Sequence, residues 1–426
     1  MKKIQMRLTI TKIMLLLIVC MLVASFIVGA IMSGVVNTEV VKNTHRPNYK
    51  RVSAETAGEI DWMEQSSLAG ADMWTQDIQM NAGIWDQEVA SVGAQALMTS
   101  ARAMATVELQ SGRLLYEKNA YERLPMASTT KILTAITVLE HVSCSSEVVK
   151  VNDKAIGIEG SSIYLQKGEE LTVKELLLGL MLRSGNDAAV ALALHVSKTV
   201  EDFAFLMNAT AFKAGAKDSS FKNPHGLDEK DHYTTAYDLA MISAYAMRNP
   251  EFAEISATKE ARISGKEYPR VIQNKNKLLR SNEGVIGVKT GFTKKAGRCF
   301  VGAMEENGMT VINVVLNCGP MFPESEYMME RAGDEFYMHK VLDKEKLVQF
   351  ETVSEKGKPM KFAGMVEEDL FYPVKRGEED KFEIKMNKHE ILVHFDGEIV
   401  QTVLYSSEFF EGEDEMLECE IVEEVA

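Results

Sequence analysis

Three short motifs along the chain combine a hydroxyl, an amine and an amide at fixed spacings. In chain order they are Ser128-Thr129-Thr130-Lys131, Ser184-Gly185-Asn186 and Lys289-Thr290-Gly291. A serine hydroxyl becomes a useful nucleophile only when a neighbouring base accepts its proton. A lysine three residues further along a helix lies on the same face, within reach of that hydroxyl. The first motif therefore predicts a serine nucleophile, Ser128, with a lysine base, Lys131.

A lysine acts as a base only in its neutral form. At its ordinary pKa near 10.4, about one lysine in 2,500 is neutral at pH 7. Burial and a nearby cation both lower a lysine pKa, and Lys289 is a candidate for that cation. The beginning of the helix that Ser128 opens adds N–H donors where an oxyanion would form. These features favour a serine acyl-transfer site.

The other two motifs supply candidates for proton transfer and substrate binding. Ser184 falls in a loop between two predicted helices, a place suited to passing a proton to a leaving amine. The third motif ends a predicted strand rich in β-branched residues. There Gly291 lets a substrate backbone approach closely, and Thr290 can bond a carboxylate. Each motif alone also has a structural explanation, since Ser128 is a good helix N-cap and Ser184-Gly185 a turn.

A second match to the first motif tests how specific its spacing is. This match, Ser219-Ser220-Phe221-Lys222, lies in a polar loop with Asn, Pro and Gly and has no helix to hold the pair. The spacing S-x-x-K arises by chance roughly once or twice in a chain of this length. The order of the three motifs, and the element that carries each, therefore favour Ser128.

Hydrophobic periodicity predicts strands at both ends of the central region and helices between them. Strands are expected at 104–109, 113–116, 285–290, 299–304 and 311–316, and helices from Ser128 onward, over 176–182, 188–196 and 203–213, and after Thr235. This order predicts an α/β (α+β) domain with one antiparallel sheet covered by helices. After about residue 340 short alternating strands predict a small all-β sandwich.

Four segments are predicted: residues 1–36, 37–95, 96–340 and 341–426. Lysines and arginines precede a 24-residue apolar run at 13–36. Two interpretations stay open, a secretory signal cleaved after Val28-Gly29-Ala30 and an uncleaved anchor long enough to span a bilayer. Both place the chain from Asn37 onward outside the cytoplasm. Residues 37–95 are a polar linker that holds all three tryptophans.

Composition excludes some partners and cofactors. The net charge of −15 argues against nucleic acid, because binding phosphates requires a basic patch. The five cysteines form no CxxC pair, and no pair of histidines suggests zinc, so neither a metal nor a cofactor is predicted. Cys299 and Cys318 flank one predicted hairpin; a single disulfide stays open, although buried free thiols are the favoured interpretation.

From about residue 101 to 318 the chain resembles the low-molecular-mass penicillin-binding proteins, the D-alanyl-D-alanine carboxypeptidase family of serine peptidases. The text around the motifs carries this resemblance: Pro125-Met126-Ala127, Arg183, Asp187-Ala188-Ala189, Asn223-Pro224-His225-Gly226-Leu227, Thr235-Ala236-Tyr237-Asp238-Leu239-Ala240, Gly287-Val288, Phe292-Thr293 and Ala296-Gly297. The resemblance implies a penicillin-binding, β-lactamase-like catalytic domain. Tyr372-Pro373-Val374-Lys375-Arg376-Gly377 resembles a turn of the small sandwich that follows it in many members.

The resemblance also implies roles. Ser128 would attack the carbonyl between two D-alanines of a peptidoglycan stem peptide, and Lys131 would take its proton. The N–H groups of Ser128 and Phe292 would form the oxyanion hole, and Ser184 would relay a proton to the departing D-alanine. Asn186 would orient the lysine and the substrate amide, while Lys289, Thr290 and Gly291 would bind the terminal carboxylate. His225 would be structural, and β-lactam antibiotics would acylate Ser128.

The sequence leaves four functions open. The carboxypeptidase is the first, and a D,D-endopeptidase acting on crosslinks uses the same residues. A β-lactamase would normally read S-D-N where this chain has Gly185, and no convincing omega-loop glutamate follows. A penicillin sensor without turnover is the fourth. The family implies an extracytoplasmic protein, membrane-associated or secreted to the cell wall; many members end in an anchor helix, and Ala426 follows none here.

Overall fold

The computed structural model describes residues 95–96, 98–346, 348–353, 359–386, 390–404 and 406–407. The chain divides into two compact units, Met1–Ala69 and Gly70–Ala426, and every described residue belongs to the second. The predicted signal or anchor, most of the predicted linker and residues 408–426 therefore lie outside the described residues. In the described ranges, no helix has the length and apolarity that crossing a membrane requires.

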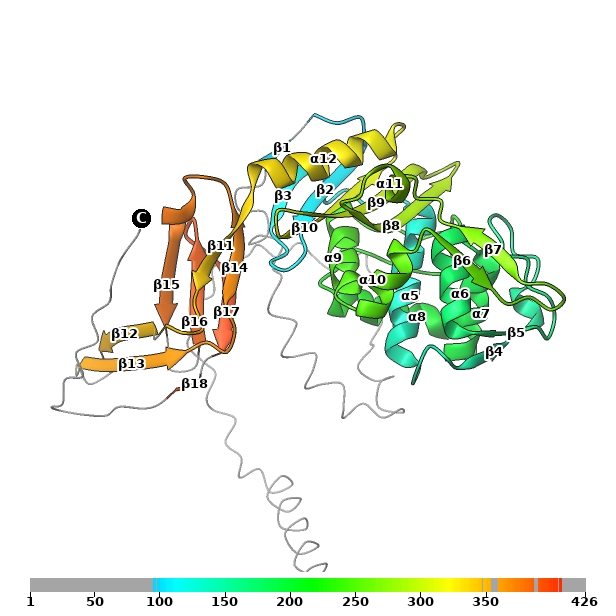
Figure 1. The fold of residues 1–426 in the computed structure, drawn as a ribbon, viewed down its shortest axis with the longest axis horizontal. Helices are drawn as coiled ribbons and strands as arrows, with labels where there is room; N and C mark the ends of the chain where they lie inside the picture. The colour runs from blue at the N-terminus through cyan, green and yellow to red at the C-terminus, as the bar shows by residue number, and fades with distance from the viewer. Residues whose placement is uncertain are drawn as a thin grey trace, which may run out of the picture. The chain divides into compact units, whose positions relative to one another are not determined.

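A six-stranded sheet forms the centre of the catalytic region (Figure 1). Its order is β1 (Gln95–Ala96), β3 (Leu114–Lys118), β2 (Ala103–Glu108), β10 (Met309–Leu316), β9 (Gly297–Glu306) and β8 (Val285–Thr293). All neighbours are antiparallel except β1 and β3. The turn between β9 and β10 carries Asn307 and Gly308, both with positive φ, as the Asn-Gly pair predicts. The predicted strands are confirmed, each within a few residues of its expected ends.

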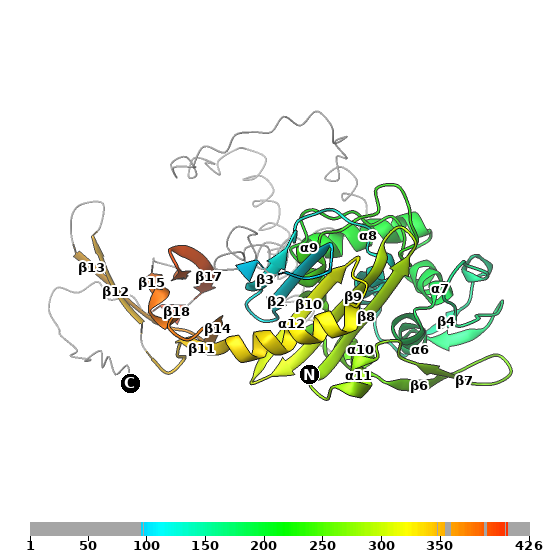
Figure 2. The same ribbon diagram turned by 90° about the horizontal axis from the view of Figure 1, so that it is seen from above.

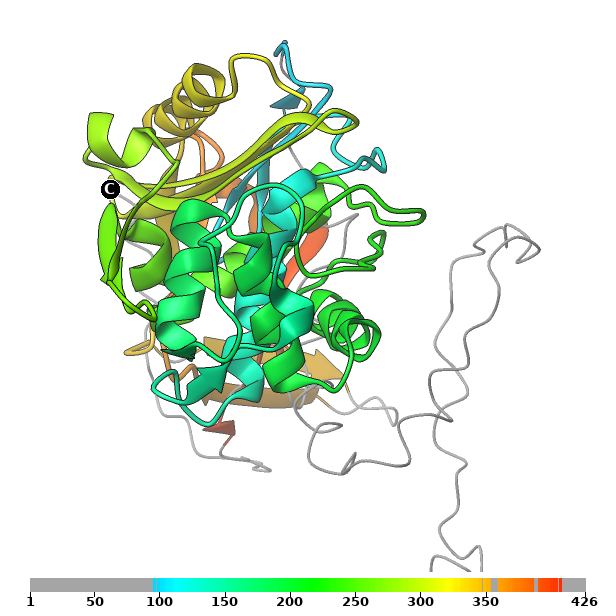
Figure 3. The same cartoon turned by 90° about the vertical axis from the view of Figure 1, so that its right-hand side faces the viewer.

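Helices cover both faces of this sheet, as seen from above in Figure 2 and from the side in Figure 3. On one face α9 contacts β2 and β10 while α10 contacts β8; on the other face α12 contacts β9 and β10. The bounds are α5 (Lys131–His141), α6 (Val173–Leu178), α7 (Asn186–Val196), α8 (Val200–Lys213), α9 (Ala236–Met247), α10 (Pro250–Ala257), α11 (Leu278–Ser281) and α12 (Met321–Glu335).

The middle strands are hydrophobic at successive positions because both of their faces are buried. In β9, Val301 belongs to the core beneath α5 and α9, whereas Phe300 belongs to the core beneath α12. Two small hairpins flank the helices: β4 (Val148–Lys150) with β5 (Glu170–Thr172), and β6 (Glu260–Ile263) with β7 (Arg270–Gln273). Thr172 and Glu175 form the expected capping box at the start of α6.

Short antiparallel strands follow α12 and build the predicted all-β region. They are β11 (Tyr337–Leu342), β12 (Val348–Val353), β13 (Pro359–Met365), β14 (Leu370–Val374), β15 (Phe382–Met386), β16 (Glu390–Phe395), β17 (Glu398–Leu404) and β18 (Ser406–Ser407). Val374, Val393 and Phe395 lie in their common core. The predicted fold class, an antiparallel sheet covered by helices and followed by small β-sheets, is confirmed; the segment boundaries stay a prediction.

Arg113, the residue before β3, joins the catalytic region to this β region. Its side chain is buried, donates to the carbonyl of Pro373 and pairs with Glu378 at 3.2 Å. The guanidinium lies over the ring of Phe395, 4.5 Å from the ring centroid. A buried cation with a carboxylate, a carbonyl and an aromatic face around it stabilises this junction.

The cysteines of the described ranges are free thiols. Cys299 and Cys318 are buried and unbridged, and Cys144 is exposed. Burial raises the pKa of Cys299 to about 11. The favoured interpretation, buried free thiols instead of a disulfide, is confirmed for Cys299 and Cys318.

Candidate active site

Ser128 lies in a short 3₁₀ helix, Ala127–Thr130, that leads directly into α5 at Lys131. Side chains three residues apart eclipse one another in a 3₁₀ helix, so this turn places the lysine beside the serine. The distance from Lys131 Nζ to Ser128 Oγ is 3.0 Å. Ser128 caps no helix, because the residue at the N-cap position is Met126. The spacing of the first motif therefore produces a close hydroxyl–amine pair.

Two further acceptors surround the Lys131 amine. Its Nζ lies 2.7 Å from Asn186 Oδ1 and also contacts the backbone carbonyl of His225. Neither acceptor can donate a hydrogen bond. In the protonated form Lys131 Nζ donates to Ser128 Oγ and to both of these oxygens. In the neutral form two N–H groups serve the Asn186 and His225 oxygens, and the lone pair is free to accept the proton of the serine.

Electrostatics also favour the neutral form of Lys131. Burial lowers its pKa well below the usual range, and the cations Lys289 and Lys275 lower it further. Lys289 is itself buried, which lowers its pKa to about 7 with a contribution from Lys275. Both causes predicted from the sequence, burial and the cation of the third motif, therefore act on Lys131.

Ser184 follows a π-helical turn, Gly179–Arg183, at the end of α6. Its backbone is left-handed, with φ 66° and ψ 37°, a region that few residues other than glycine adopt. The residue is buried, with 3% of its surface exposed. Strained backbone of this kind is concentrated at functional sites. The structure thus places Ser184 two residues before Asn186 without linking it to Ser128 or Lys131.

Gly291 of the third motif makes a close approach to the nucleophile. A Cβ atom added there would lie 3.0 Å from the Met126 carbonyl oxygen and 3.1 Å from the nitrogens of Ser128 and Thr129. Lys289 Nζ donates to the carbonyl of Thr290 at 3.1 Å, and Phe292 is 64% exposed at the mouth of the site. Strand β8 therefore runs past the start of the Ser128 helix with no space for a side chain between them.

The loop between α8 and α9 packs against the turn that carries Ser128. Gly226, with φ +82°, packs against the Ala127 carbonyl, where a Cβ would be 2.0 Å away. His232 Nδ1 accepts from the Lys222 N–H at 3.0 Å, and its Nε2 lies 3.0 Å from Thr130 Oγ1. Burial lowers the pKa of His232 to about 4, so its ring is neutral at pH 7. This loop also supplies the carbonyl of His225 that contacts the catalytic amine.

The second S-x-x-K match plays no part in this cluster. Ser219 Oγ bonds Thr234 and Asp238, each at 2.7 Å, and not Lys222. His225 contributes its carbonyl, while burial lowers the pKa of its ring to about 3. Both observations agree with the interpretation that these residues are structural.

A second loop crosses the opposite side of the site and is held by Asp187. This buried carboxylate accepts hydrogen bonds from the N–H groups of Ile163 and Leu165 and from the Ser162 hydroxyl. Tyr164 between them has a left-handed backbone, with φ 62°, and is 73% exposed. The anchored loop therefore presents Tyr164 to solvent at a fixed place.

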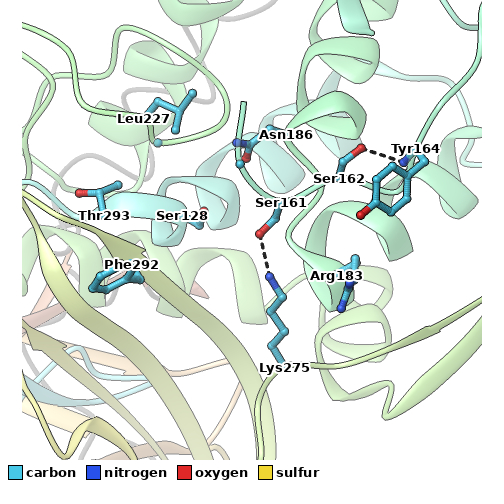
Figure 4. Close-up of a pocket in the computed structure, with 12 residues that line it drawn as sticks. Ser128, Ser161, Ser162, Tyr164, Arg183, Asn186, Leu227, Lys275, Phe292 and Thr293 are labelled. Carbon is cyan, nitrogen blue, oxygen red and sulfur yellow. Dashed lines mark hydrogen bonds between the residues drawn. The ribbon is translucent and has the colours of Figure 1, made fainter. Parts of the chain in front are cut away.

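A cavity of about 400 Å³ opens between these elements (Figure 4). It is lined by Ser128, Gly160, Ser161, Ser162, Tyr164, Arg183, Asn186, Gly226, Leu227, Lys275, Phe292 and Thr293. Sequence reasoning missed Ser161, Tyr164 and Lys275, because no motif surrounds them. Across the described ranges, no group of three or more His, Cys, Asp or Glu side chains is placed to hold a metal ion.

Comparison with known proteins identifies the family of the chain. The family model described as D-alanyl-D-alanine carboxypeptidase (Peptidase_S11) matches residues 90–319. The D-alanyl-D-alanine carboxypeptidase DacF of Bacillus subtilis is 34% identical over 303 residues, which cover 68% of this chain and 77% of that protein. DacC of Escherichia coli is 34% identical over 252 residues, covering 55% of this chain and 62% of that protein.

Solved structures give the same result for the fold. Penicillin binding protein 5 of Haemophilus influenzae superimposes with a TM-score of 0.63 at 24% identity, covering 73% of this chain and 97% of that one. The S216A mutant of the Streptomyces K15 DD-transpeptidase has a TM-score of 0.53 at 32% identity, covering 56% of this chain and 99% of that one.

Proposed function

The chain belongs to the D-alanyl-D-alanine carboxypeptidase family of serine peptidases, and from this premise we propose that Ser128 is the nucleophile with which it removes the terminal D-alanine from peptidoglycan stem peptides. The observation that carries this assignment is the contact of Lys131 Nζ with Ser128 Oγ, Asn186 Oδ1 and the His225 carbonyl. These contacts hold the amine beside the serine hydroxyl, and burial with the nearby cations lowers its pKa toward the neutral form that a base requires.

Acylation begins when neutral Lys131 takes the Ser128 proton and Oγ attacks the carbonyl between the two D-alanines. The tetrahedral oxyanion is stabilised by the backbone N–H groups of Ser128 and Phe292. Because Gly291 lets β8 pass so close to the nucleophile turn, these two donors can converge on one oxygen. Ser184 passes a proton to the departing amine and regains one from protonated Lys131, so that D-alanine leaves and Lys131 is neutral again. Lys131 then takes a proton from the water that attacks the acyl-enzyme, and returns it to Ser128 Oγ as the ester bond breaks.

The terminal carboxylate of the substrate binds at Lys289 and Thr290. A buried lysine with a pKa of about 7 is only partly charged at neutral pH. A carboxylate beside it favours the charged form, so substrate binding and protonation of Lys289 support each other. The same arrangement accepts the carboxylate of a β-lactam, whose lactam carbonyl then acylates Ser128.

Peptidoglycan lies outside the cytoplasm, so the protein acts in an extracytoplasmic compartment. The apolar run at 13–36 supports either a cleaved signal or a membrane anchor as the means of export. Comparing the N-terminus of the mature protein in membrane and soluble fractions separates these two possibilities. A start near residue 31 in the soluble fraction indicates cleavage, and an intact start in the membrane indicates an anchor.

D-alanine release from diacetyl-lysyl-D-alanyl-D-alanine by the full chain tests the proposal. We expect steady release that Ser128→Ala abolishes, while Ser219→Ala, in the second S-x-x-K match, retains it. A fluorescent penicillin should label the wild type and not Ser128→Ala. Labelling without release would replace the carboxypeptidase by an endopeptidase or a sensor. The absence of both labelling and release would overturn the assignment of Ser128 as the nucleophile.

A further inference from the structure

The cavity in front of Ser128 is cationic, although the protein as a whole is acidic. Its lining contains two cations, Arg183 and Lys275, and no carboxylate. The net charge of the chain is −15. Partial burial and the neighbouring Arg183 cation both lower the pKa of Lys275. Two cations held this close, without an acid to neutralise them, provide a site for an anion.

These two cations are additional to the lysine that the terminal carboxylate uses. Figure 4 shows Arg183 and Tyr164 on the side of the cavity away from Ser128 and Phe292, with Lys275 between. Lys289 lies on β8, is buried, and is near enough to Lys131 to lower its pKa. The cavity therefore contains a second cationic place, separate from the third motif.

Both cations are available to a ligand. Lys275 is positioned by a 2.7 Å hydrogen bond from Nζ to Ser161 Oγ, and by a backbone bond from its N–H to the Leu182 carbonyl. Within the described ranges, the Arg183 guanidinium is exposed and pairs with no carboxylate. An exposed guanidinium can bind a carboxylate with two parallel hydrogen bonds.

Tyr164 completes this end of the cavity. Its left-handed backbone, with φ 62°, is held by the Asp187 hydrogen bonds to both neighbouring residues, and its ring stays 73% exposed. Strained backbone of this kind is concentrated at functional sites. The exposed ring at the edge of the cavity is suited to contacting the apolar part of a ligand.

The leaving group of the proposed reaction is a single D-alanine, which has one carboxylate. A second anion on the substrate must then belong to the acyl part, which remains on Ser128. We propose that Arg183 and Lys275 bind a carboxylate carried by the residue that precedes D-alanyl-D-alanine, with Tyr164 against the intervening methylenes. This inference rests on the proposed function and adds a preference for substrates in which that carboxylate is free over those in which it is an amide.

Matched peptides test the preference. The probes are acetyl-X-D-alanyl-D-alanine with X as glutamate or glutamine, and as 2-aminopimelate or its ω-amide, so that each pair differs only in charge. We expect the wild type to have a kcat/KM about tenfold higher for the carboxylate in at least one pair, because a hydrogen bond to a charged group is stronger than one to a neutral amide. That ratio should fall as salt rises.

The variant Arg183→Gln should remove this ratio by lowering kcat/KM for the carboxylate peptides to the value for the amide peptides. Arg376→Gln removes an equal charge from an exposed residue of the β region and should preserve the ratio. Equal rates for both members of each pair would overturn the inference. An equal fall in kcat/KM for the carboxylate and amide peptides, and in the rate of labelling by penicillin, would overturn the inference and assign Arg183 to the terminal carboxylate instead. If Ser128-dependent release is absent from every peptide, the proposed function fails, and this inference with it.

Discussion

Replacing Gly291 by alanine tests how the nucleophile and the third motif fit together. The added Cβ would meet three backbone atoms: the Met126 oxygen at 3.0 Å and the nitrogens of Ser128 and Thr129 at 3.1 Å. Ordinary contacts of a Cβ atom are 3.4–4 Å, so the strand or the turn must move by a few tenths of an ångström. Because all three atoms are backbone, no side chain can rotate away to relieve the contact.

The atoms that must move include the Ser128 N–H, a proposed oxyanion donor. Losing one such donor costs about 10²–10³ in kcat in serine peptidases. We expect Gly291→Ala to keep part of that donation and to lower the rate of acylation about 10²-fold, which is about 2.7 kcal/mol in the barrier. The strain should also lower the free energy of unfolding by about 1–3 kcal/mol.

The assay is the second-order rate constant for labelling by a fluorescent penicillin, measured beside thermal unfolding. Gly302→Ala is the matched control, because its Cβ would meet Phe300 and Met329 side-chain atoms at 2.9–3.0 Å in the α12 core. That variant should lose stability but acylate at the wild-type rate. Wild-type acylation by Gly291→Ala, or an equal loss in both variants, would refute the proposed link between β8 and the oxyanion hole.

Three further predictions concern charge and burial. Lys275→Met removes a cation that lowers the pKa of Lys131, so the acid limb of the kcat/KM profile should move to higher pH. The pKa of His232 is about 4 in the folded protein and about 6.5 in the unfolded chain, so the unfolded chain binds more protons between these pH values. The free energy of unfolding should therefore fall by up to about 3 kcal/mol as the pH falls through that window. In chemical denaturation, His232→Gln should reduce this fall. Arg113→Met leaves Glu378 without its buried partner and should lower the free energy of unfolding by about 3 kcal/mol while D-alanine release persists at low temperature.

The first and third of these predictions have a control outside the feature tested. Lys277→Met removes an exposed lysine two residues after Lys275 and should leave the acid limb of the kcat/KM profile in place. Arg123→Met breaks an exposed pair with Asp218 and should change stability by less than about 1 kcal/mol. An unmoved acid limb, an unchanged pH slope or a fully stable Arg113→Met would each contradict the corresponding argument.

The strands and the proximity of Ser128 and Lys131 could be predicted because their signals are local. Alternating and β-branched residues gave β9 and β10, and a three-residue spacing placed Lys131 beside Ser128. Helix formation over 176–182 was predicted correctly in type, but the last turn is a π turn. That change leaves Ser184 in a left-handed conformation, which no hydrophobic pattern encodes.

The rest of the site depends on tertiary contacts between distant segments. Lys275 and Arg183 line the same cavity, although neither belongs to a repeating pattern that would place it there. Asp187 resembles a helix-start acid in sequence but anchors the loop that carries Tyr164. His225 acts through its carbonyl, which every residue has, so its type gave no signal.

The order of strands in the central sheet makes the site depend on contacts between distant parts of the chain. β2 pairs with β10, which follows it by roughly 200 residues, and β8 lies at the edge of the same sheet. Pairings this distant in the chain form slowly. Ser128 therefore meets the β8 residues Lys289 and Phe292 only after the sheet has formed, so the return of penicillin labelling during refolding should follow the slow formation of these pairings.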